Sequence, residues 1–434
     1  MLLPIARSGR PCAQAQRRQR GAVAVIVALS ALALLGFAGM AIDVGRLYIN
    51  RTELQSAADA CALAAAGELT CDPGAGTCPG SFLLNAQAAG IYAAGRNSRD
   101  FQVNPVVIAA ADVTFSTALA PNANYLSIAG GASPNSRYAM CTARATGITP
   151  WFMSAFGIGG QTVTSAGVAT RAPSQSFCNA APLGLCSKPG GYTVGEWITG
   201  DFTSNGNGNN AADDVAGSFR WIDFTPSAGG NSEIRDQLVG ASNVCGIQVG
   251  SNVRQPGVQQ GAKTAYNSRF GIYPNGANAY DPTTAPPDRT GYAYPNKSPG
   301  SPVIGVGTSA YSDYRRRQGL NTTTDTPFIS NQYAPSGAAG NIAGTPDSTL
   351  SDYVALGSDR RLVAVPIIDC AAGNTVPILN MACVLLLNPM SNGATGTIYL
   401  EYRGDASTVG SPCRVGGFSG GPASTGPQVP TLVQ

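Results

Sequence analysis

The sequence of 434 residues contains no histidine. This absence excludes the Ser-His-Asp and Cys-His arrangements of nucleophilic catalysis, histidine zinc sites and imidazole general bases. The chain also lacks a G-x-x-x-x-G-K-[ST] phosphate loop and a G-x-G-x-x-G segment that follows a strand and opens a helix. Carboxylate pairs, lysine bases and Ser-Lys dyads remain open, but no motif selects them. We therefore expect a protein that is not an enzyme and has no catalytic, cofactor-binding or metal-binding residues.

Charged residues are also scarce. They make up 12% of the chain, whereas glycine and proline together number 84. This composition is typical of loop-rich secreted proteins rather than of compact cytosolic enzymes. The formal net charge is +3, but five arginines lie in the first twenty residues, and the remainder holds 22 basic and 24 acidic residues. This balance gives no reason to expect a nucleic-acid partner.

The longest feature that is present is an apolar run at residues 21–42, which contains no charged side chain and no amide side chain. As a helix it would be about 33 Å long, enough for the ~30 Å hydrocarbon core of a bilayer. Three arginines closely precede the run, and no acidic residue comes before Asp43. The positive-inside rule then predicts a cytoplasmic tail at residues 1–20, a transmembrane helix at residues 21–42, and extracytoplasmic domains after Asp43.

A cleaved signal peptide is the alternative interpretation, because Gly39-Met40-Ala41 is a passable cleavage site. The apolar run is longer than the ~7–15 residues usual in signal peptides. In addition, a helical pattern continues through residues 43–66, which contain no proline and a single glycine, Gly45. These two features favour a retained transmembrane helix that continues into a long helix outside the membrane. Small residues four apart, such as Ala41 and Gly45, would let a second membrane helix approach closely.

The same segment carries a resemblance to a known family. The residues concerned are Arg20-Gly21-Ala22-Val23-Ala24, Gly39-Met40-Ala41-Ile42-Asp43-Val44-Gly45-Arg46-Leu47-Tyr48, Arg51, Leu54-Gln55 and Ala57-Ala58-Asp59-Ala60-Cys61-Ala62-Leu63-Ala64-Ala65-Ala66. They resemble the N-terminal module of TadE/TadG-like proteins, membrane components of the bacterial machinery that assembles tight-adherence (Flp) pili. The resemblance implies that the family motif here consists of Asp43, Gly45, Arg46, Tyr48, Arg51, Leu54, Gln55 and Asp59.

The resemblance also implies a location and partners. It implies a single-pass protein of the bacterial inner membrane with a cytoplasmic N-terminus and periplasmic C-terminal domains. The implied partners are pilus assembly or pilin proteins, the lipid bilayer through one helix, and a second helix within the membrane. The family usually has alanine at the position of Cys61, and pseudopilin relatives carry glutamate at the position of Ile26. The second departure favours the unprocessed, TadG-like role.

Cysteine usage agrees with an exported protein. Cys12 lies alone before the apolar run, and ten cysteines follow it. An even number in an oxidising compartment predicts a disulfide framework, and we expect at least three bridges, although several cysteines could instead be small buried apolar residues. The short turn-rich segments between Cys71 and Cys78 and between Cys178 and Cys186 favour local bridges for both pairs. The spacing leaves the full connectivity open.

The expected fold class is α+β, with the N-terminal transmembrane helix followed by loop-rich mixed α/β extracytoplasmic domains. Residues 43–173 form the first expected domain, of α+β type like the TadE/G module. Its elements after the long helix are a helix at residues 81–96, strands at residues 101–107, 112–117, 138–146 and 161–171, and a short apolar helix at residues 151–156.

A second mixed α/β domain is expected at residues 174–415. Its strands are expected at residues 218–223, 361–368, 382–387 and 396–403, and a short helix at residues 232–239. Residues 416–434 are rich in Gly, Ser and Pro and predict a flexible tail. Residues 201–214 match several positions of a calcium loop, but Ala212 stands where the twelfth ligand, Glu, would be, so a flexible Asn/Gly turn is favoured.

Three functions are consistent with these features. The first is a membrane-anchored, non-enzymatic component of a tight-adherence (Flp/type IVb) pilus assembly or secretion system, which acts through protein–protein contacts. The second is an exported adhesin-like binding protein that uses exposed tyrosines in the Pro-rich segment at residues 273–302. The third is a hydrolase with paired carboxylates near two tryptophans, drawn from Glu196, Asp201, Asp213, Asp214 and Asp223. Three successive arginines at residues 315–317 favour a solvated helix face over an anion-binding patch.

Overall fold

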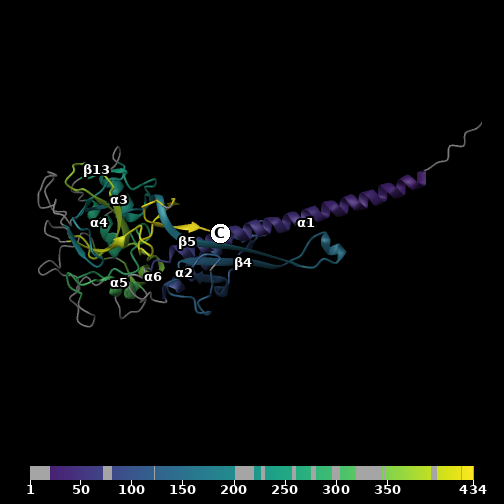
Figure 1. The fold of residues 1–434 in the computed structure, drawn as a ribbon, viewed down its shortest axis with the longest axis horizontal. Helices are drawn as coiled ribbons and strands as arrows, with labels where there is room; N and C mark the ends of the chain where they lie inside the picture. The colour runs from purple at the N-terminus through teal and green to yellow at the C-terminus, as the bar shows by residue number, and fades with distance from the viewer. Residues whose placement is uncertain are drawn as a thin grey trace, which may run out of the picture.

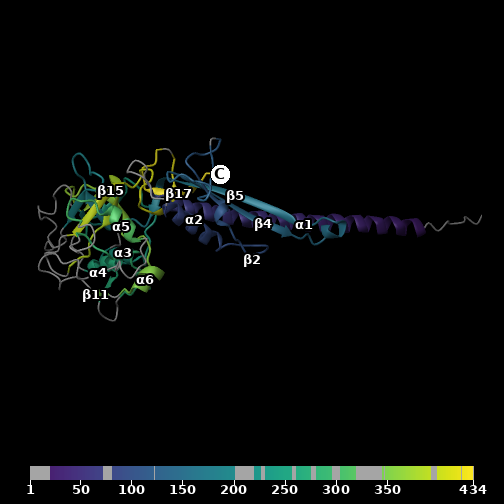
Figure 2. The same ribbon diagram turned by 90° about the horizontal axis from the view of Figure 1, so that it is seen from below.

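The structure is a computed structural model that describes residues 20–71, 81–121, 123–200, 219–225, 230–256, 261–274, 280–295, 304–318, 345–346, 348–391, 398–421 and 423–433. Figure 1 shows an elongated molecule in which the N-terminal part of helix α1 (Arg20–Gly67) projects away from a body formed by the rest of the chain. Two long strands, β4 and β5, run beside the middle of α1, and Figure 2 shows the same arrangement after a rotation by 90°.

Helix α1 is a single helix of 48 residues, as the uninterrupted pattern predicted. Alanine and leucine favour helix, and no proline breaks it. Its two halves differ in exposure. The large apolar side chains between Val23 and Phe37 are 59–71% exposed, whereas Leu54 and the small residues that follow it on the same face are fully buried. Helix α1 is therefore long and apolar enough to cross a membrane, and its C-terminal half belongs to a protein core.

The C-terminal half of α1 packs against α2 (Ser81–Ala94) and an antiparallel sheet. This sheet contains β3 (Val113–Ser116), β4 (Tyr138–Ile148), β5 (Gln161–Cys178), β16 (Gly416–Ser419) and β17 (Gln428–Leu432). Four alternate residues of β4 are buried with the small residues of α1, and small side chains on both elements let helix and sheet approach closely: Ala139, Cys141, Ala143 and Ala145. Shorter elements complete this part: β1 (Ser98–Arg99), β2 (Asn104–Pro105) and the 3-10 helices η2 (Ala110–Asp112) and η3 (Met153–Phe156).

Two sequence predictions for this sheet need correction. The strand expected at residues 101–107 is reduced to β2, because residues 100–102 form a turn with left-handed backbone angles. The tail expected at residues 416–434 is not loose over its described part, because β16 and β17 both pair with β5. The 18-residue β5 is longer than β4, so its exposed edge offers backbone groups that a Gly- and Pro-rich segment can satisfy.

A second sheet, of mixed direction, forms the centre of the remaining chain. Its strand order is β7 (Trp197–Gly200), β15 (Ile398–Asp405), β14 (Asn380–Leu386), β12 (Leu362–Ile368), β6 (Leu183–Cys186), β8 (Phe219–Trp221). Strand β12 is parallel to β6, and the other neighbours are antiparallel. Successive residues of β12 enter two different hydrophobic clusters, since Leu362 and Ala364 face one and Val363 and Val365 face the other. The sheet is therefore covered on both faces, which explains why its strands are continuously apolar.

Short helices and strands cover this second sheet. The helices are α3 (Asn231–Val239), α4 (Ala262–Asn267), η4 (Ser268–Phe270), α5 (Tyr311–Gln318) and α6 (Leu350–Ala355). Two small antiparallel pairs join β9 (Asn252–Arg254) with β13 (Thr375–Pro377) and β10 (Ile272–Tyr273) with β11 (Thr345–Pro346). Helices α3 and α4 contact each other and contribute side chains to one of the two clusters.

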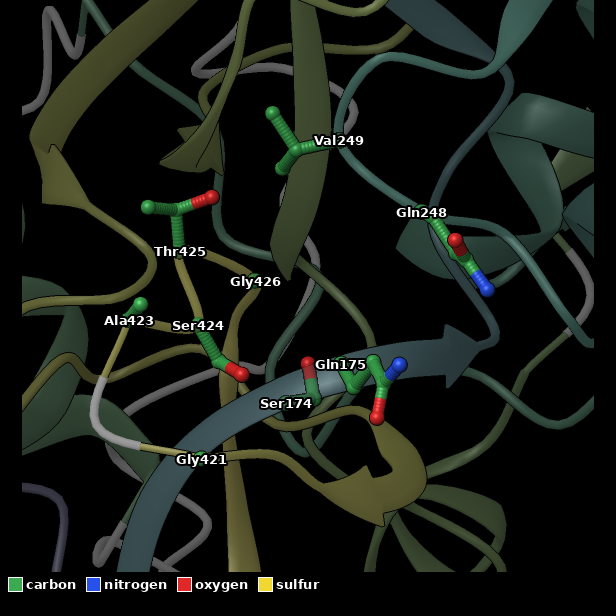
Figure 3. Close-up of a pocket in the computed structure, with 9 residues that line it drawn as sticks. All are labelled: Ser174, Gln175, Gln248, Val249, Gly421, Ala423, Ser424, Thr425 and Gly426. Carbon is green, nitrogen blue, oxygen red and sulfur yellow. The ribbon is translucent and has the colours of Figure 1, made fainter.

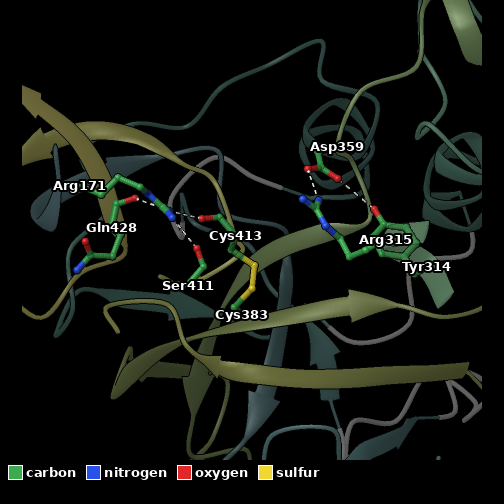
Figure 4. Close-up of a disulfide and its surroundings, with 8 residues drawn as sticks. All are labelled: Arg171, Tyr314, Arg315, Asp359, Cys383, Ser411, Cys413 and Gln428. Atoms are coloured by element: carbon green, nitrogen blue, oxygen red, sulfur yellow. Dashed lines mark hydrogen bonds and ion pairs between the residues drawn. A yellow bond between two sulfur atoms is a disulfide. The ribbon is translucent and has the colours of Figure 1, made fainter. Parts of the chain in front are cut away.

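Two arginines connect the first sheet and the end of α1 to loops that flank the second sheet. Arg171 of β5 donates hydrogen bonds to the carbonyl oxygens of Ser411 and Cys413, each at 2.6 Å (Figure 4). Arg414 donates to Glu68 near the end of α1 at 2.5 Å and to Asp359 at 2.8 Å. These hydrogen bonds involve charged groups, which makes them stronger than neutral hydrogen bonds, and they connect the two parts of the molecule.

Four disulfide bridges are described, which confirms the expectation of at least three. They join Cys61 to Cys141, Cys178 to Cys245, Cys186 to Cys370 and Cys383 to Cys413. The predicted local bridge between Cys178 and Cys186 is wrong. Cys186 ends β6 beside Ile368 of β12, and this register places it against Cys370. Cys71 is disulfide-bonded, but Cys78 lies outside the described residues.

Three of the four tyrosines of the Pro-rich segment are buried and form no binding face, and the fourth, Tyr280, is half-buried. Tyr273, Tyr292 and Tyr294 are at most 2% exposed. The hydroxyl group of Tyr273 donates to the carbonyl oxygen of Ala285, and that of Tyr294 donates to Asp313. Buried tyrosines with satisfied hydroxyls stabilise a core, so the surface on which the adhesin-like alternative depended is absent among these residues.

The three successive arginines do not form a solvated helix face either. On α5, Arg317 is buried, pairs with Asp313 at 2.7 Å and lies over the ring of Tyr292. Arg315 pairs with Asp359 at 3.3 Å. Asp313 and Asp359 thus neutralise the charges of Arg317 and Arg315 within the fold, whereas Arg316 stays exposed.

Candidate functional site at the helix–hairpin junction

The motif residue Asp43 holds the turn between β4 and β5. Its carboxylate accepts three backbone hydrogen bonds, from Trp151 at 2.7 Å, Phe152 at 2.9 Å and Met153 at 2.6 Å. These N–H groups lie at the start of η3, where no local side chain accepts them. Asp43 therefore acts as a helix cap supplied by a different element. Its side chain comes directly after the apolar run and is buried at 1% exposure.

Asp43 keeps its charge in this position. Burial by itself would raise the pKa of Asp43, but the three backbone donors and the charge of Arg46 outweigh it and hold the pKa below its ordinary value. The carboxylate is thus a permanent acceptor at neutral pH. A hydrogen-bonded charge in this place fixes the turn against α1 more strongly than a neutral cap would.

Arg46, one helical turn further along α1, connects three segments. Its guanidinium pairs with Asp100 at 2.8 and 2.9 Å, donates to the carbonyl oxygen of Thr149 at 2.9 Å and lies 4.5 Å from the ring centre of Trp151. Asn50 adds hydrogen bonds to the carbonyl oxygen of Arg46 and to Asp100. The hydrogen bond and charge of Arg46 lower the pKa of Asp100, and Asp100 raises the pKa of Arg46. The pair is therefore ionised and bidentate, the strong geometry for arginine and a carboxylate.

The turn that carries Asp100 is strained. Asp100, Phe101 and Gln102 have φ angles of 57°, 61° and 65°. Three successive non-glycine residues in the left-handed region cost on the order of 1 kcal/mol each and persist only where other contacts hold them. Besides the arginine contact, Gln102 donates to Glu53 at 2.9 Å, and the ring of Phe101 stacks on Trp151 at 6.4 Å. Contacts from α1 and the hairpin thus hold this turn in place.

Further along α1, three other motif residues fit the helix onto β5. Leu54 is fully buried. Gln55 donates to Asp59 at 2.8 Å and to the carbonyl oxygen of Ala166 at 3.0 Å. A Cβ atom at Gly167 would lie 2.4 Å from the Asp59 carboxylate, so only glycine allows this approach of strand to helix. The spacing of these motif residues therefore corresponds to the face of a helix that packs directly on a strand.

The side chains of the remaining three motif residues do not hold the hairpin, although the backbone carbonyl oxygen of Arg51 accepts a hydrogen bond from Ser165 of β5 at 3.1 Å. Tyr48 is 71% exposed, Arg51 is exposed, and a Cβ atom at Gly45 would have no neighbour within 4 Å. The structure therefore divides the motif in two. Asp43, Arg46, Leu54, Gln55 and Asp59 form the internal junction, and Gly45, Tyr48 and Arg51 point outward.

Sequence reasoning missed the partners of this junction. Asn50, Asp100, Thr149 and the residues 151–153 lie outside the motif or far from it in the chain, and only the fold brings them to α1. The predicted short apolar helix at residues 151–156 is present as η3. Nothing in the sequence indicated that its N-terminal amides would face Asp43.

The two described acidic residues among those considered for hydrolysis, Glu196 and Asp223, are each paired with a basic residue. Glu196 pairs with Lys188, whereas Asp223 is fully buried and pairs with Arg254 at 3.2 Å. The other three acids, and the candidate calcium loop at residues 201–214, lie outside the described residues. Within the described ranges, no group of three His, Cys, Asp or Glu side chains could hold a metal ion.

A pocket of about 410 Å³ lies where β5 meets the segment between β16 and β17 (Figure 3). None of its described lining residues carries an ionisable side chain: Ser174, Gln175, Gln248, Val249, Gly421, Ala423, Ser424, Thr425 and Gly426. It offers hydroxyl and amide hydrogen bonds, but no group that could act as a general acid or base.

A comparison with known protein families finds a match to the helix of the junction, α1. A family model described as "Putative Flp pilus-assembly TadE/G-like" matches residues 21–68, which cover almost all of α1. No curated protein and no solved structure matches the chain. The similarity therefore ends where α1 ends, and it includes both the apolar half of the helix and the motif residues of the junction.

Proposed function

We propose that this chain is a non-enzymatic, inner-membrane-anchored component of a tight-adherence (Flp/type IVb) pilus assembly or secretion system. It has a cytoplasmic N-terminus and periplasmic domains that contact pilus assembly proteins or pilins. The observation that carries the proposal is the position of the family match. It coincides with one helix whose N-terminal half is uncovered and apolar and whose C-terminal half is packed into a domain.

The uncovered half of α1 supports membrane anchorage. A stretch of large apolar side chains, each more than half exposed, would be costly in water at roughly 25 cal/mol per Å². A bilayer removes this cost and leaves every backbone group paired within the helix. We propose the same two domains as the sequence predicts, at residues 43–173 and 174–415. The last two strands, β16 and β17, join the sheet of the first domain.

The outward motif residues support a role in assembly. Gly45, Tyr48 and Arg51 belong to the family motif, but the exposed side chains of Tyr48 and Arg51 take no part in the junction, to which only the backbone carbonyl of Arg51 contributes. A motif residue that does not stabilise its own fold is a candidate for contact with another protein. We propose that this side of α1 meets a second helix in or near the membrane.

The test is a deletion strain of the source bacterium, scored for pili on the cell surface. Loss of surface pili, restored by the wild-type gene, is the expected result. Arg46→Ala should fail to restore pili because it breaks the junction, whereas Arg96→Ala, at an exposed position after α2, should restore them. Normal pili in the deletion strain would overturn the proposal.

The N-terminus of the mature protein separates this proposal from the adhesin-like alternative. A membrane-bound chain with an intact residue 1–42 segment is expected. A soluble chain that begins at Ile42, together with normal pili and reduced surface binding in the deletion strain, would favour the released binding protein.

A further inference from the structure

The turn between β4 and β5, residues 149–160, is named here the hairpin tip. It lies beside the apolar half of α1 and away from the body of the molecule (Figures 1 and 2). A Cβ atom at Gly39 would lie 2.7 Å from Phe152, and one at Gly36 would lie 4.0 Å from the ring of Phe156. The tip therefore contacts α1 inside the run that a membrane would have to cover. We propose that the hairpin tip inserts into the hydrocarbon of the leaflet nearest the extracytoplasmic domains.

The length of the uncovered helix is the first argument. Residues 21–35 lie before the first contact with the tip and would span about 22 Å as a helix, less than the ~30 Å core of a bilayer. The helix spans the core only if the bilayer also includes residues 36–42. The hairpin tip lies against this same stretch, so a bilayer thick enough for α1 also surrounds the tip.

The side chains of the tip suit this environment. Four large apolar residues are exposed there: Trp151 at 55%, Phe152 at 48%, Phe156 at 73% and Ile158 at 40%. No charged residue occurs between Arg144 and Arg171. Trp151, which touches Arg46 at the level of Asp43, occupies the depth at which tryptophan is enriched at membrane interfaces.

Much of the tip's backbone is also hydrogen-bonded, which favours a lipid environment. Asp43 accepts the N–H groups of residues 151–153, and the N–H groups of Ala155, Gly157 and Ile158 donate to carbonyl oxygens within the tip. The side chain of Gln161 donates to the carbonyl oxygen of Gly159. These hydrogen bonds lower the cost of placing this part of the turn in hydrocarbon.

The hairpin tip is therefore surrounded by phospholipid acyl chains, and this inference rests on the proposed membrane anchorage of α1. It can be tested with the full chain in liposomes of phosphatidylcholine brominated along its acyl chains, because bromine quenches tryptophan at short range. Besides Trp151, the chain contains Trp197 and Trp221, which lie in the second sheet. Reporters are placed in a Trp151→Phe background, so that each signal is a difference from that background.

Three reporters are compared at positions that are exposed and tolerate a larger ring. Phe156→Trp reports on the tip, Phe37→Trp on α1 itself, and Tyr92→Trp on an exposed site of α2 that should stay in water. We expect Phe156→Trp to lose as large a fraction of its fluorescence as Phe37→Trp, and Tyr92→Trp to lose none. Quenching of Phe37→Trp with Phe156→Trp unquenched would overturn the insertion of the tip and leave the anchorage intact. Failure of the chain to float with the liposomes, with Phe37→Trp unquenched, would overturn the anchorage and the insertion together.

Discussion

Replacing Cys61 and Cys141 by alanine removes the covalent link between α1 and β4. The bridge closes a separation of 80 residues, and the chain-entropy relation assigns it about 4.5 kcal/mol of stabilisation through the unfolded state. The bridge between Cys383 and Cys413 has a separation of 30 residues, for which the same relation gives about 3.6 kcal/mol. We expect the loss of the first bridge to act on α1, β4 and β5, because both of its cysteines lie in their shared core.

Hydrogen exchange measured by mass spectrometry on the detergent-solubilised full chain can localise this effect. In the double alanine variant, the slowest amides of β4 and β5 should exchange up to about three orders of magnitude faster, since each 1.4 kcal/mol is about tenfold. The matched control, Cys383→Ala with Cys413→Ala, should accelerate exchange mainly in β14 of the second sheet, where Cys383 lies. Unchanged exchange in β4, or equal effects of both variants on β4, would refute the reasoning.

Two further predictions concern the tip and the network between the sheets. Gly39→Leu should displace Phe152 and accelerate exchange of the tip amides, whereas Gly45→Leu, with no neighbour within 4 Å of its Cβ position, should not; equal exchange in both would contradict the close approach. Burial would raise the pKa of Asp359, but the nearby charges, chiefly that of Arg414, lower it from 3.8 to about 2. Ionised Asp359 therefore stabilises the fold by roughly 2 kcal/mol above pH 4, and this contribution is lost as the pH falls toward 2. Asp359→Asn should remove this loss from acid unfolding curves, and an unchanged pH slope would contradict it.

Local pattern was sufficient for the parts of the fold that depend on neighbours in the chain. The absence of proline and the alanine content after Asp43 predicted one long helix, and α1 runs unbroken to Gly67. Alternation predicted β4, and the continuous apolar run at residues 362–368 predicted a buried strand. These features depend on helix and strand periodicity, which each short segment carries by itself.

Contacts between distant segments were not predictable in the same way. A Gly- and Pro-rich C-terminus gave no sign of pairing, yet it completes the sheet of β5 because that strand has an unpaired edge. The bridge between Cys178 and Cys245 depends on where β5 ends relative to a loop about 67 residues later in the chain. Arg315 of α5 was expected in solvent because its carboxylate partner, Asp359, is remote in sequence.

The sequence by itself determined that a helix continues from an uncharged apolar run into a motif-bearing segment, because hydrophobicity and helix propensity are properties of consecutive residues. Only the tertiary structure decided what the motif does: that Asp43 caps a 3-10 helix more than a hundred residues away, and that Arg46 fastens a strained turn to the same hairpin. These roles arise from the directions in which side chains leave one turn of α1. The side chains of Asp43 and Arg46 have these partners only because β4 and β5 pack against the helix.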